Sequence, residues 1–358
     1  MKVFCWNING IRSLLASIGD LQTLFERWDA DVVCFQETRI NADTLPREAQ
    51  HVPGYQSFWS FCGTKKGYSG VATYCRESTG VVAAHTHVEE DREGRILLLD
   101  LGHFVLFNCY FPNGGSDGQR LDYKDGFFSL VLRLAGPYLQ QGRPMAIVGD
   151  VNVAYLPLDI SNPILDDTLN CFRPVERKMM HRLLEAGFVD CYRWKYPEGT
   201  DRTWYDPAVP VRTPRSGWRI DYALLTPQLH QGHFVDTRMF PEQLGSDHCP
   251  LVLELSPFPP LATTPPLHPL SSLRVLRSQR SIASFFIPQS KPTDPALLPA
   301  SASAPSVVMH PSSSSSPFSS SSSSSSSSQS SSSIKIIPKR VKPNQTMTSN
   351  HSKRKRAH

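Results

Sequence analysis

Short apolar runs, separated by polar, Gly and Asn positions, recur through the first 257 residues of the chain. Their length and their β-branched and aromatic content predict strands, at residues 3–6, 31–35, 70–75, 95–101, 104–111, 144–149, 220–225 and 250–255. Apolar residues spaced three and four apart instead predict helices, at residues 19–30, 127–139 and 175–187. Many strands with a few helices between them predict an α/β fold in which sheets pack face to face under outer helices.

The chain changes composition at about residue 258. Pro and Ser dominate the remainder, and residues 312–333 are Ser apart from Pro317, Phe318 and Gln329. A segment of this composition cannot bury enough apolar surface to offset the entropy lost on ordering. We therefore predict one folded domain at residues 1–257, followed by a disordered Pro/Ser-rich tail at residues 258–358.

Charge is divided unevenly between these two parts. Residues 258–358 hold 12 of the 37 Lys and Arg residues and one of the 32 acids, which gives them a net charge of +11. The whole chain has a net charge of +5, so residues 1–257 have a net charge of −6. An acidic domain does not bind nucleic acid by charge alone, unless bound cations offset its carboxylates.

All eight Cys residues lie in the predicted domain, and none forms a Cys-x-x-Cys pair. Several fall inside apolar runs, which favours buried free thiols in a reducing compartment over disulfides or zinc ligands. No apolar run approaches the ~18 residues of a membrane span, and the first apolar stretch is too short for a signal peptide. We expect a soluble intracellular monomer that does not associate with membranes.

Polar side chains follow the predicted strands at the points where the strands end. The residues at these strand ends are Asn7, Asn9, Glu37, Tyr110, Asp150 and Asn152. A single ending of this kind is usually an ordinary turn. Repeated delivery of polar groups beside Gly and Asn indicates one rim where loops converge.

The candidate chemistry is rich in oxygen donors. The set comprises the carboxylates of Glu37, Asp150, Asp221 and Asp247, the amides of Asn7, Asn9, Asn113 and Asn152, the imidazole of His248 and the phenol of Tyr110. Hard oxygen ligands without a Cys and His cluster favour Mg²⁺, for which Mn²⁺ can substitute, over Zn²⁺. Mg²⁺ keeps coordination positions open for phosphate oxygens, so a phosphoester is the expected substrate.

Six motifs occur in the order found in the exonuclease III family of apurinic/apyrimidinic (AP) endonucleases, namely "WNINGIR", "CFQET", "YFPNGG", "GDVNVAY", "SGWRIDYALL" and "GSDHCPL". The chain resembles this family over about residues 1–256. The resemblance implies a four-layered α/β sandwich, with two packed mixed sheets flanked by helices, and an endonuclease/exonuclease/phosphatase catalytic domain at residues 1–257. It also implies an active site at one edge of the sandwich and incision of DNA with Mg²⁺.

The resemblance further implies which residues hold the metal. Glu37 resembles the principal Mg²⁺ ligand, and the implied metal shell is drawn from Asn7, Glu37, Asp150, Asn152, Asp247 and His248. Some members of the family have Asp where this chain has Asn9. This chain therefore has one negative charge fewer near the metal shell, which bears on its affinity for Mg²⁺. Whether one metal ion or two are bound stays open.

For catalysis, Asp150 resembles the carboxylate that positions or deprotonates the attacking water, and Asn152 resembles the amide that orients it. Tyr110 resembles the phenol beside the scissile phosphate, and His248 the donor to a non-bridging oxygen. Asp221 resembles the acid that holds this histidine. Which group acts as the general base stays open.

Asp247 and His248 are neighbours in the sequence, but in an extended chain successive side chains point to opposite faces. We therefore expect Asp221 to be the partner of His248, which leaves Asp247 free to face the metal. From the residues alone, the alternatives are a surface or capping role for Asp221, interior packing of Tyr110 and a thiol nucleophile at Cys249.

Two Trp residues are candidates for recognition of damaged double-stranded DNA. Trp204 and Trp218 resemble the aromatic pair that lines the family's pocket for a base-free sugar; the alternative is that both pack in the core. A flipped-out abasic sugar costs little unstacking and offers an apolar face to such a pocket. Arg12 and Asn113 are the expected contacts to backbone phosphates, and the loop at 212–217 adds two Arg residues near the DNA.

Two segments of the tail carry motifs. Gln279, Ile282, Phe285 and Phe286 match the Q-x-x-[ILM]-x-x-F-F box that docks on the sliding clamp of DNA replication (PCNA). Residues 339–356 resemble a bipartite nuclear import signal, for which a basic patch that attracts DNA is the alternative. We expect a protein of the nucleus that the clamp recruits through residues 279–286.

The expected function is that of a Mg²⁺-dependent DNA repair phosphodiesterase that incises DNA 5′ of abasic sites, with 3′→5′ exonuclease and 3′-end cleaning activity. The clamp box resembles the second type of eukaryotic AP endonuclease, but this tail has no Cys for the zinc finger usual there, and "YFPNGG" is closer to bacterial exonuclease III. The balance of activities therefore stays open. The alternatives are a phosphatase or RNA deadenylase of the same fold, or a non-catalytic clamp-binding adaptor, which would be expected to lack some of the rim residues.

Overall fold

The computed structural model describes residues 1–86, 89–161 and 168–259. The strands are β1 (Lys2–Asn7), β2 (Val32–Gln36), β3 (Tyr55–Ser60), β4 (Val71–Arg76), β5 (Ala83–Thr86), β6 (Ile96–Asp100), β7 (Val105–Tyr110), β8 (Met145–Asp150), β9 (Val189–Asp190), β10 (Trp204–Tyr205), β11 (Gly217–Trp218), β12 (Asp221–Leu225), β13 (Phe234–Met239) and β14 (Leu251–Leu255). The helices are α1 (Ile11–Ile18), α2 (Leu21–Trp28), α3 (Arg47–Gln50), α4 (Leu121–Gln140), α5 (Pro174–Glu185), α6 (Cys191–Lys195) and α7 (Pro227–His233).

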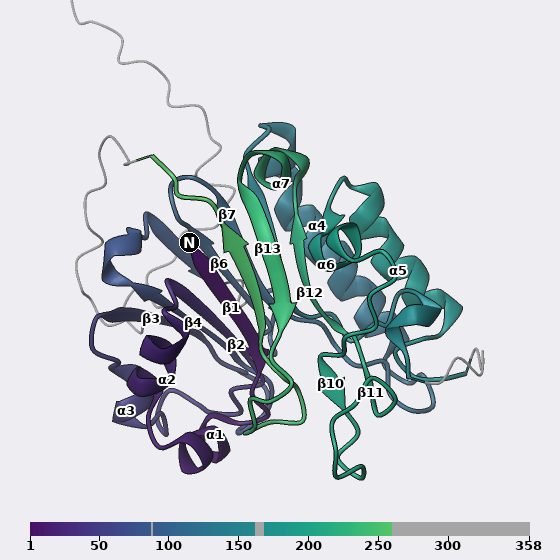
Figure 1. The fold of residues 1–358 in the computed structure, drawn as a ribbon, viewed down its shortest axis with the longest axis horizontal. Helices are drawn as coiled ribbons and strands as arrows, with labels where there is room; N and C mark the ends of the chain where they lie inside the picture. Colours follow the sequence, from purple (N-terminus) through teal and green to yellow (C-terminus); the bar gives the residue numbers. More distant parts are fainter. Residues whose placement is uncertain (87–88, 162–167, 260–358) are drawn as a thin grey trace, which may run out of the picture. The chain divides into compact units, whose positions relative to one another are not determined.

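These strands form two six-stranded sheets and one short ribbon (Figure 1). The first sheet has the order β13-β14-β1-β2-β4-β3 and the second the order β5-β6-β7-β8-β12-β9, while β10 and β11 pair with each other. Both sheets are mixed, because β1 runs parallel to β2 and β7 runs parallel to β8 among antiparallel neighbours. Each parallel pair brings two strand ends to the same edge of its sheet.

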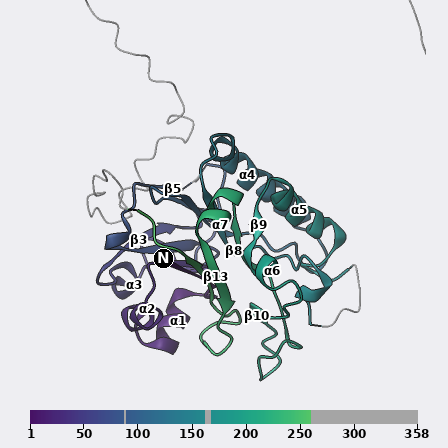
Figure 2. The ribbon, with the colours of Figure 1, turned by 45° about the horizontal axis from the view of Figure 1, so that its top comes forward.

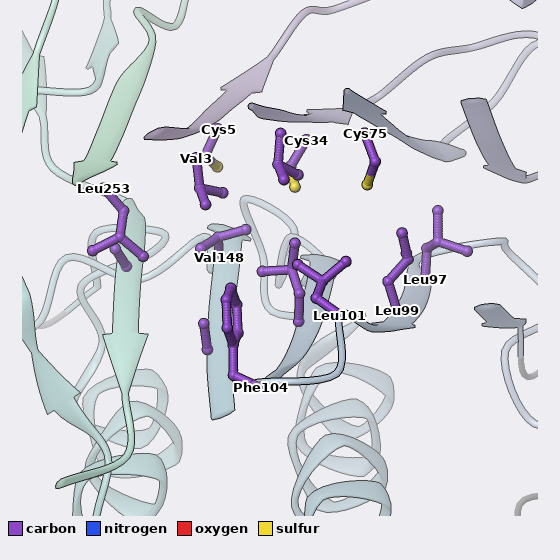
Figure 3. Packing of buried hydrophobic residues seen from close by; sticks show 14 of the residues in the cluster. Val3, Cys5, Cys34, Cys75, Leu97, Leu99, Leu101, Phe104, Val148 and Leu253 are labelled. Carbon is purple, nitrogen blue, oxygen red and sulfur yellow. The ribbon is translucent and has the colours of Figure 1, made fainter. Parts of the chain in front are cut away.

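The two sheets pack face to face around an apolar core (Figure 3). Val3 and Cys5 of β1 point into this core, as do Leu97 and Leu99 of β6. The residues that alternate with Val3 and Cys5 on β1 point to the opposite face and join a second apolar cluster. This period of two is the geometry of a strand whose two faces are both covered.

Helices cover the outer face of each sheet (Figures 1 and 2). Helices α1, α2 and α3 share one apolar cluster with the outer face of the first sheet, and α4 and α5 share another with the second sheet. The contacts are largely aromatic; Phe25 of α2, for example, lies 6.0 Å from Phe35 of β2 between ring centroids. The predicted four-layered α/β sandwich is confirmed.

Each strand and helix that the hydrophobic pattern predicted is present, and all lie within a few residues of their predicted ends except α4, which begins six residues before its predicted start. Four of the strands that the pattern missed are β3, β5, β9 and β13, and they are the edges of the two sheets. An edge strand has one neighbour and one exposed side, so polar residues interrupt its apolar pattern.

The ordered packing continues one residue past the predicted domain end at 257. Phe258, which the prediction assigned to the tail, lies 4.9 Å from His103 and 4.1 Å from His233 between ring centroids. All eight Cys residues are free and buried, as predicted. No helix among the described residues is long and apolar enough to span a membrane. The predicted clamp box at 279–286 and the basic segment at 339–356 lie outside the described residues.

Candidate active site

Three neighbouring strands of the second sheet place three predicted site residues side by side. Tyr110 ends β7, Asp150 ends β8 and Asp221 begins β12, and the strand register pairs Asp150 with each of the other two. All three side chains are buried. The first sheet contributes Asn7, whose Nδ2 donates to Asp150 Oδ2 at 2.9 Å. The structure therefore brings strand ends of both sheets together at one rim.

Gly149 sets the backbone that delivers Asp150 to the rim. Its φ is +143°, and a Cβ atom at this position would lie 1.8 Å from the carbonyl oxygen of Cys109 on β7. No residue with a side chain fits this close approach of two strands. The Gly before Asp150 is therefore a requirement of the site's geometry.

Asp150 is held by hydrogen bonds on both oxygens. The backbone N–H of Asn152 donates to Oδ1 at 2.8 Å, and its side-chain Nδ2 donates to Oδ2 at 3.0 Å. Asn152 adopts a left-handed φ of +54°, a conformation that is uncommon for residues other than Gly and clusters at functional sites. Burial raises the pKa of Asp150 to about 7, and the Asp221 carboxylate adds to this rise. A carboxyl with this pKa can exchange a proton near neutral pH.

His248 pairs with Asp221 and not with its sequence neighbour Asp247. Its Nδ1 donates to Asp221 Oδ2 at 2.8 Å, and its Nε2 lies 3.9 Å from Asp150 Oδ2. Burial alone would lower the pKa of His248, but the carboxylates of Asp221, Asp150 and Asp247 outweigh it and raise this pKa to about 10. A charged imidazole donates hydrogen bonds from both ring nitrogens. The expected partnership of Asp221 and His248 is confirmed.

Glu37, the predicted principal metal ligand, lies next to Asn7 and Tyr110. Its Oε1 accepts a hydrogen bond from Asn7 Nδ2 at 3.0 Å. Its Oε2 accepts two from the guanidinium of Arg39, from Nε at 2.9 Å and from Nη2 at 2.6 Å. Burial pushes the pKa of Glu37 up, but Arg39 and hydrogen bonds from Asn7 and Tyr110 hold it below its usual value. Sequence reasoning missed Arg39.

Asp247 joins Trp204, one of the predicted aromatic pair, to the rim. Its Oδ2 accepts a hydrogen bond from Trp204 Nε1 at 3.0 Å, and its Oδ1 accepts one from Asn9 Nδ2 at 2.9 Å. Burial raises the pKa of Asp247, but the charge of His248 and these two hydrogen bonds lower it overall. The carboxylate is therefore ionised and fixed in orientation.

The residues at the rim fit a hard divalent cation. Asp150, Asp221 and His248 each offer a ligand atom within 4.8 Å of the other two. Asp221 Oδ1 is buried without a hydrogen-bond partner in the described part of the chain. Most donors here are carboxylate oxygens, which Mg²⁺ prefers. Glu37 and Asp247, the other predicted acidic ligands, lie outside this group of three.

The predicted DNA-binding residues occupy different positions around the rim. Trp204 and Trp218 pair across the ribbon of β10 and β11 with their ring centroids 5.7 Å apart, and both are half-buried. Figure 1 shows this ribbon at the same end of the sheets as α1. Asn113 donates to Asn152 Oδ1 at 3.1 Å, so it belongs to the inner network. Arg12 is exposed at the start of α1, with Nη2 bound to the Thr44 carbonyl at 2.9 Å.

Arg212, one of the two Arg residues expected near the DNA, joins two loops. Arg212 donates to the carbonyl oxygens of Pro241, Gln243 and Ser246, and its guanidinium lies 5.1 Å from the Tyr205 ring centroid. These contacts tie the loop after β10 to the loop before β14. A hollow of about 420 Å³ lies between the two loops and reaches Asp247, with Val209, Val211 and Leu244 in its lining.

Two buried charges behind the rim were missed by sequence reasoning. The guanidinium of Arg95 lies 4.4 Å from the Tyr110 ring centroid and donates to the Tyr110 carbonyl at 3.1 Å. Lys124 donates to the Asn152 carbonyl at 2.7 Å and to Glu176 Oε1 at 2.6 Å. Charged residues in polar stretches usually lie on the surface. For Lys124 one signal was available, since it precedes the buried Phe127 by three residues on one helix face.

The sequence profile of the Endonuclease/Exonuclease/phosphatase family matches residues 4–248. The chain belongs to this family. Family membership makes the protein a hydrolase. It is 34% identical over 260 residues to an exodeoxyribonuclease of Bacillus subtilis (strain 168), across 71% of this chain and 98% of that protein. It is also 34% identical over 260 residues to the DNA repair nuclease APEX1 of Danio rerio, across 72% of this chain and 82% of that protein.

Solved structures of other members of the Endonuclease/Exonuclease/phosphatase family have the same fold. The catalytic domain of Xenopus laevis APE2 matches with a TM-score of 0.65 and 31% identity, across 71% of this chain and 91% of that one. The 3′ phosphatase NExo from Neisseria, bound to a product DNA hairpin, matches with a TM-score of 0.64 and 25% identity, across 72% and 99%. The expected kinship with exonuclease III and the AP endonucleases is confirmed.

Proposed function

We propose that this protein is a Mg²⁺-dependent DNA repair nuclease that incises DNA 5′ of abasic sites and also trims and cleans 3′ ends. The observation that carries the proposal is the pairing of His248 with Asp221, which leaves Nε2 of the imidazole 3.9 Å from Asp150 Oδ2. Phosphodiester hydrolysis needs a group that takes a proton from water and a charged donor for the phosphoryl oxygens. Asp150 and His248 provide both within one buried site.

In the proposed reaction, Asp150 accepts the proton of the attacking water, since its pKa of about 7 lets it do so near neutral pH. Asn152 fixes this carboxylate with two hydrogen bonds and orients the water. His248 donates from Nε2 to a non-bridging phosphate oxygen, while Asp221 holds the ring and its charge. Tyr110 lies at the phosphate, where its buried hydroxyl excludes bulk water.

Glu37, Asn7 and Asp247 are the residues that would hold Mg²⁺, with a contribution from Asp150. A bound Mg²⁺ supplies charge neutralisation of the phosphate that no side chain of this acidic domain provides alone. Asn7 serves both halves of the site, because its amide donates to Glu37 and to Asp150. The metal shell and the hydrolytic residues are thus coupled through one side chain.

Two observations favour DNA as the substrate. The named relatives include a DNA repair nuclease and an exodeoxyribonuclease. The Trp204 and Trp218 rings form a half-buried aromatic wall, and Trp204 is bound to Asp247 of the rim. An aromatic wall beside the hydrolytic residues suits a base-free sugar that has left the helix.

Removal of 3′-terminal groups is part of the same proposal. The Neisseria protein with this fold is a 3′ phosphatase solved with a product DNA hairpin. The hydrolytic residues described here act on the phosphorus centre and do not require a particular leaving group, so a 3′ phosphate and an internal phosphodiester are both suitable substrates.

We further propose that the tail directs this activity in the nucleus. Its clamp box at 279–286 carries Ile282, Phe285 and Phe286, and its basic segment at 339–356 resembles an import signal. An apolar plug in a Pro- and Ser-rich segment has no core to join, which favours a role in docking.

Replacement of His248 tests the proposed chemistry. We expect His248→Ala to lower incision of an abasic duplex by roughly 10²–10⁴-fold, because the charged donor is lost. The matched control is His181→Ala, which removes an exposed imidazole of α5 and should incise at the wild-type rate. Both variants should keep the wild-type circular dichroism spectrum. Near-wild-type incision by a folded His248→Ala would rule out the assignment.

A further inference from the structure

The carboxylate proposed to hold the metal already has a cation on it. Both donors of one edge of the Arg39 guanidinium reach Glu37 Oε2, with Nε at 2.9 Å and Nη2 at 2.6 Å. The other oxygen, Oε1, accepts from Asn7 Nδ2 at 3.0 Å. Neither oxygen of Glu37 is therefore free of a donor in this arrangement.

The backbone on either side of this contact is fixed. Glu37 and Arg39 both have left-handed φ values, +51° and +49°. The backbone N–H groups of Thr38 and Arg39 donate to the carbonyl oxygens of Gly70 and Ser69 at 3.0 and 2.8 Å. Uncommon φ values that are locked by neighbouring backbone indicate a built arrangement rather than a loose loop.

The Arg39 side chain, in contrast, has room to move. It is 45% exposed, whereas the Glu37 side chain is 15% exposed. Two cations cannot share one carboxylate oxygen without strong repulsion, and a divalent ion attracts the carboxylate more strongly than a guanidinium does. Of the two groups, the half-exposed guanidinium is the one that can leave.

We propose that Arg39 is a resident counter-cation of Glu37 that a divalent metal displaces, and that the released guanidinium then binds a phosphate of the DNA. This inference rests on the proposed function and adds a mechanism of ordered assembly to it. The metal-free protein keeps its acidic rim neutralised by Arg39. Metal binding releases the Arg39 guanidinium, which can then bind the substrate phosphate.

Phosphate is the fitting destination for the released group. A guanidinium presents a planar fork of N–H donors that matches two phosphate oxygens. Arg39 already lies within electrostatic reach of Tyr110 and Asp247, which border the proposed phosphate position. A short movement off Glu37 therefore keeps the guanidinium at the rim. Metal and DNA binding then strengthen each other, because each removes Arg39 from the same carboxylate.

Metal binding without DNA tests the displacement step. In calorimetric titrations of the full chain with Mn²⁺, we expect Arg39→Ala to bind the ion roughly two- to tenfold more tightly than wild type, since the competing cation is gone. The control is Lys65→Ala, which removes an exposed cation that lies over the Tyr68 ring, at 4.9 Å from the ring centroid. Equal or weaker Mn²⁺ binding by Arg39→Ala overturns the proposal. An equal gain in Lys65→Ala also overturns it, because the effect would then be long-range charge.

The position of the guanidinium can be followed directly by NMR. We expect the Arg39 Nε–H signal, assigned by its loss in Arg39→Lys, to be protected from exchange without metal. Saturating Mg²⁺ should shift the signal and remove that protection. A signal that keeps its shift and its protection at saturating Mg²⁺ contradicts displacement.

Binding to a duplex tests the second step. With Ca²⁺ in place of Mg²⁺ and the abasic duplex recovered intact, Arg39→Ala should lower the slope of log affinity against log salt by about one. In EDTA, where Arg39 stays on Glu37, the slope should match wild type. A change of equal size in both conditions overturns the phosphate role. Each of these readouts is independent of incision, so a protein that incises DNA but fails these tests keeps its proposed function and loses only this inference.

Discussion

At the scale of single residues, burial and neighbouring charge decide what each group of the rim can do. His248 lies among carboxylates and keeps a positive charge, since its pKa is raised to about 10. Asp150, deeper in the same site, has its pKa raised to about 7 by burial and by Asp221. One buried pocket therefore holds a charged donor beside a carboxyl that can take up a proton, which is the combination that hydrolysis requires.

At Asp91, which lies outside the proposed catalytic residues, burial and hydrogen bonds again shift the pKa in opposite directions. It is buried, and its Oδ2 accepts the backbone N–H groups of Arg95 and Ile96 at the start of β6. Burial raises the pKa of Asp91 to about 6, against these two hydrogen bonds. The ionised carboxylate consequently costs the folded state free energy above that pH.

This pKa predicts a pH dependence of stability. The folded pKa lies above the ~3.9 of an unfolded Asp, so the folded state binds the proton first and gains stability as the pH falls from about 6 to about 4. Asp91→Asn removes this titration. Between about pH 7 and pH 4.5, wild type should gain ~2 kcal/mol of unfolding free energy relative to Asp91→Asn in urea titrations. If the difference in unfolding free energy between wild type and Asp91→Asn does not change with pH, the raised pKa of Asp91 is refuted.

At the scale of secondary-structure elements, the packing of α4 on α5 supports the rim from behind. Lys124 of α4 and Glu176 of α5 form an ion pair in which both side chains are fully buried. Glu176 lies in the first turn of α5, where the helix dipole favours a negative charge. Lys124 also binds the carbonyl oxygen of Asn152. The two helices are thus connected to the residue that fixes Asp150.

We expect Glu176→Ala to lower the free energy of unfolding by ~3–5 kcal/mol, because it leaves the Lys124 charge buried without its carboxylate. The matched control is Asp125→Ala, which breaks a partly exposed pair with Arg182 between the same two helices and should cost ~1 kcal/mol or less. Chemical denaturation of both variants measures the difference. If both variants lose the same free energy of unfolding, the buried ion pair of Glu176 contributes no more than the partly exposed one, and the prediction is wrong.

The strands that the sequence pattern predicted are those covered on both faces. Strands β2, β7 and β8 are buried along their whole length, so they appear as unbroken apolar runs. The edge strand β13 alternates exposed and half-buried residues around Thr237 and gave no such run. Helix α4 begins at Leu121, six residues before the predicted start, because the polar stretch at its beginning hides the buried Lys124.

The candidate site could be predicted only in part for a related reason. Polar residues directly after apolar runs, such as Asp150 and Glu37, stand out in the sequence because the strand end places them at the rim. Arg39, in a polar stretch, and Arg95, the first residue of a predicted strand, have no such marker, since charged residues are usually solvated. Their roles depend on contacts with Glu37 and Tyr110 that only the folded chain brings about.

At the scale of the whole molecule, opposite charges are divided between a catalytic domain and a tail. Residues 1–257 carry a net charge of −6, and residues 258–358 carry a net charge of +11, from 12 Lys and Arg residues and one acid. An acidic rim suits cation binding, whereas a basic tail suits an acidic polymer or an import receptor. This division favours separate tasks for the two parts, with hydrolysis in the first and recruitment in the second.

Replacement of the two Phe residues of the clamp box tests this separation. We expect Phe285→Ala with Phe286→Ala to abolish binding to the sliding clamp, because the apolar plug is lost, and to leave cleavage of a short duplex unchanged. Phe318→Ala, a Phe in the Ser tract outside the box, should bind the clamp like wild type. Surface plasmon resonance with immobilised clamp gives the comparison. Clamp binding that survives the double replacement would exclude residues 279–286 as the docking segment.

The central claim, a metal-dependent nuclease for abasic DNA, is tested most directly by one cleavage assay. The full chain is incubated with an end-labelled duplex that contains one abasic site, with Mg²⁺ or with EDTA, beside an undamaged duplex and a 3′-phosphate duplex. We predict one nick 5′ of the abasic site that needs Mg²⁺, loss of the 3′ phosphate, and no internal nick in undamaged DNA. An abasic duplex that stays intact with folded protein at saturating Mg²⁺ would contradict the account.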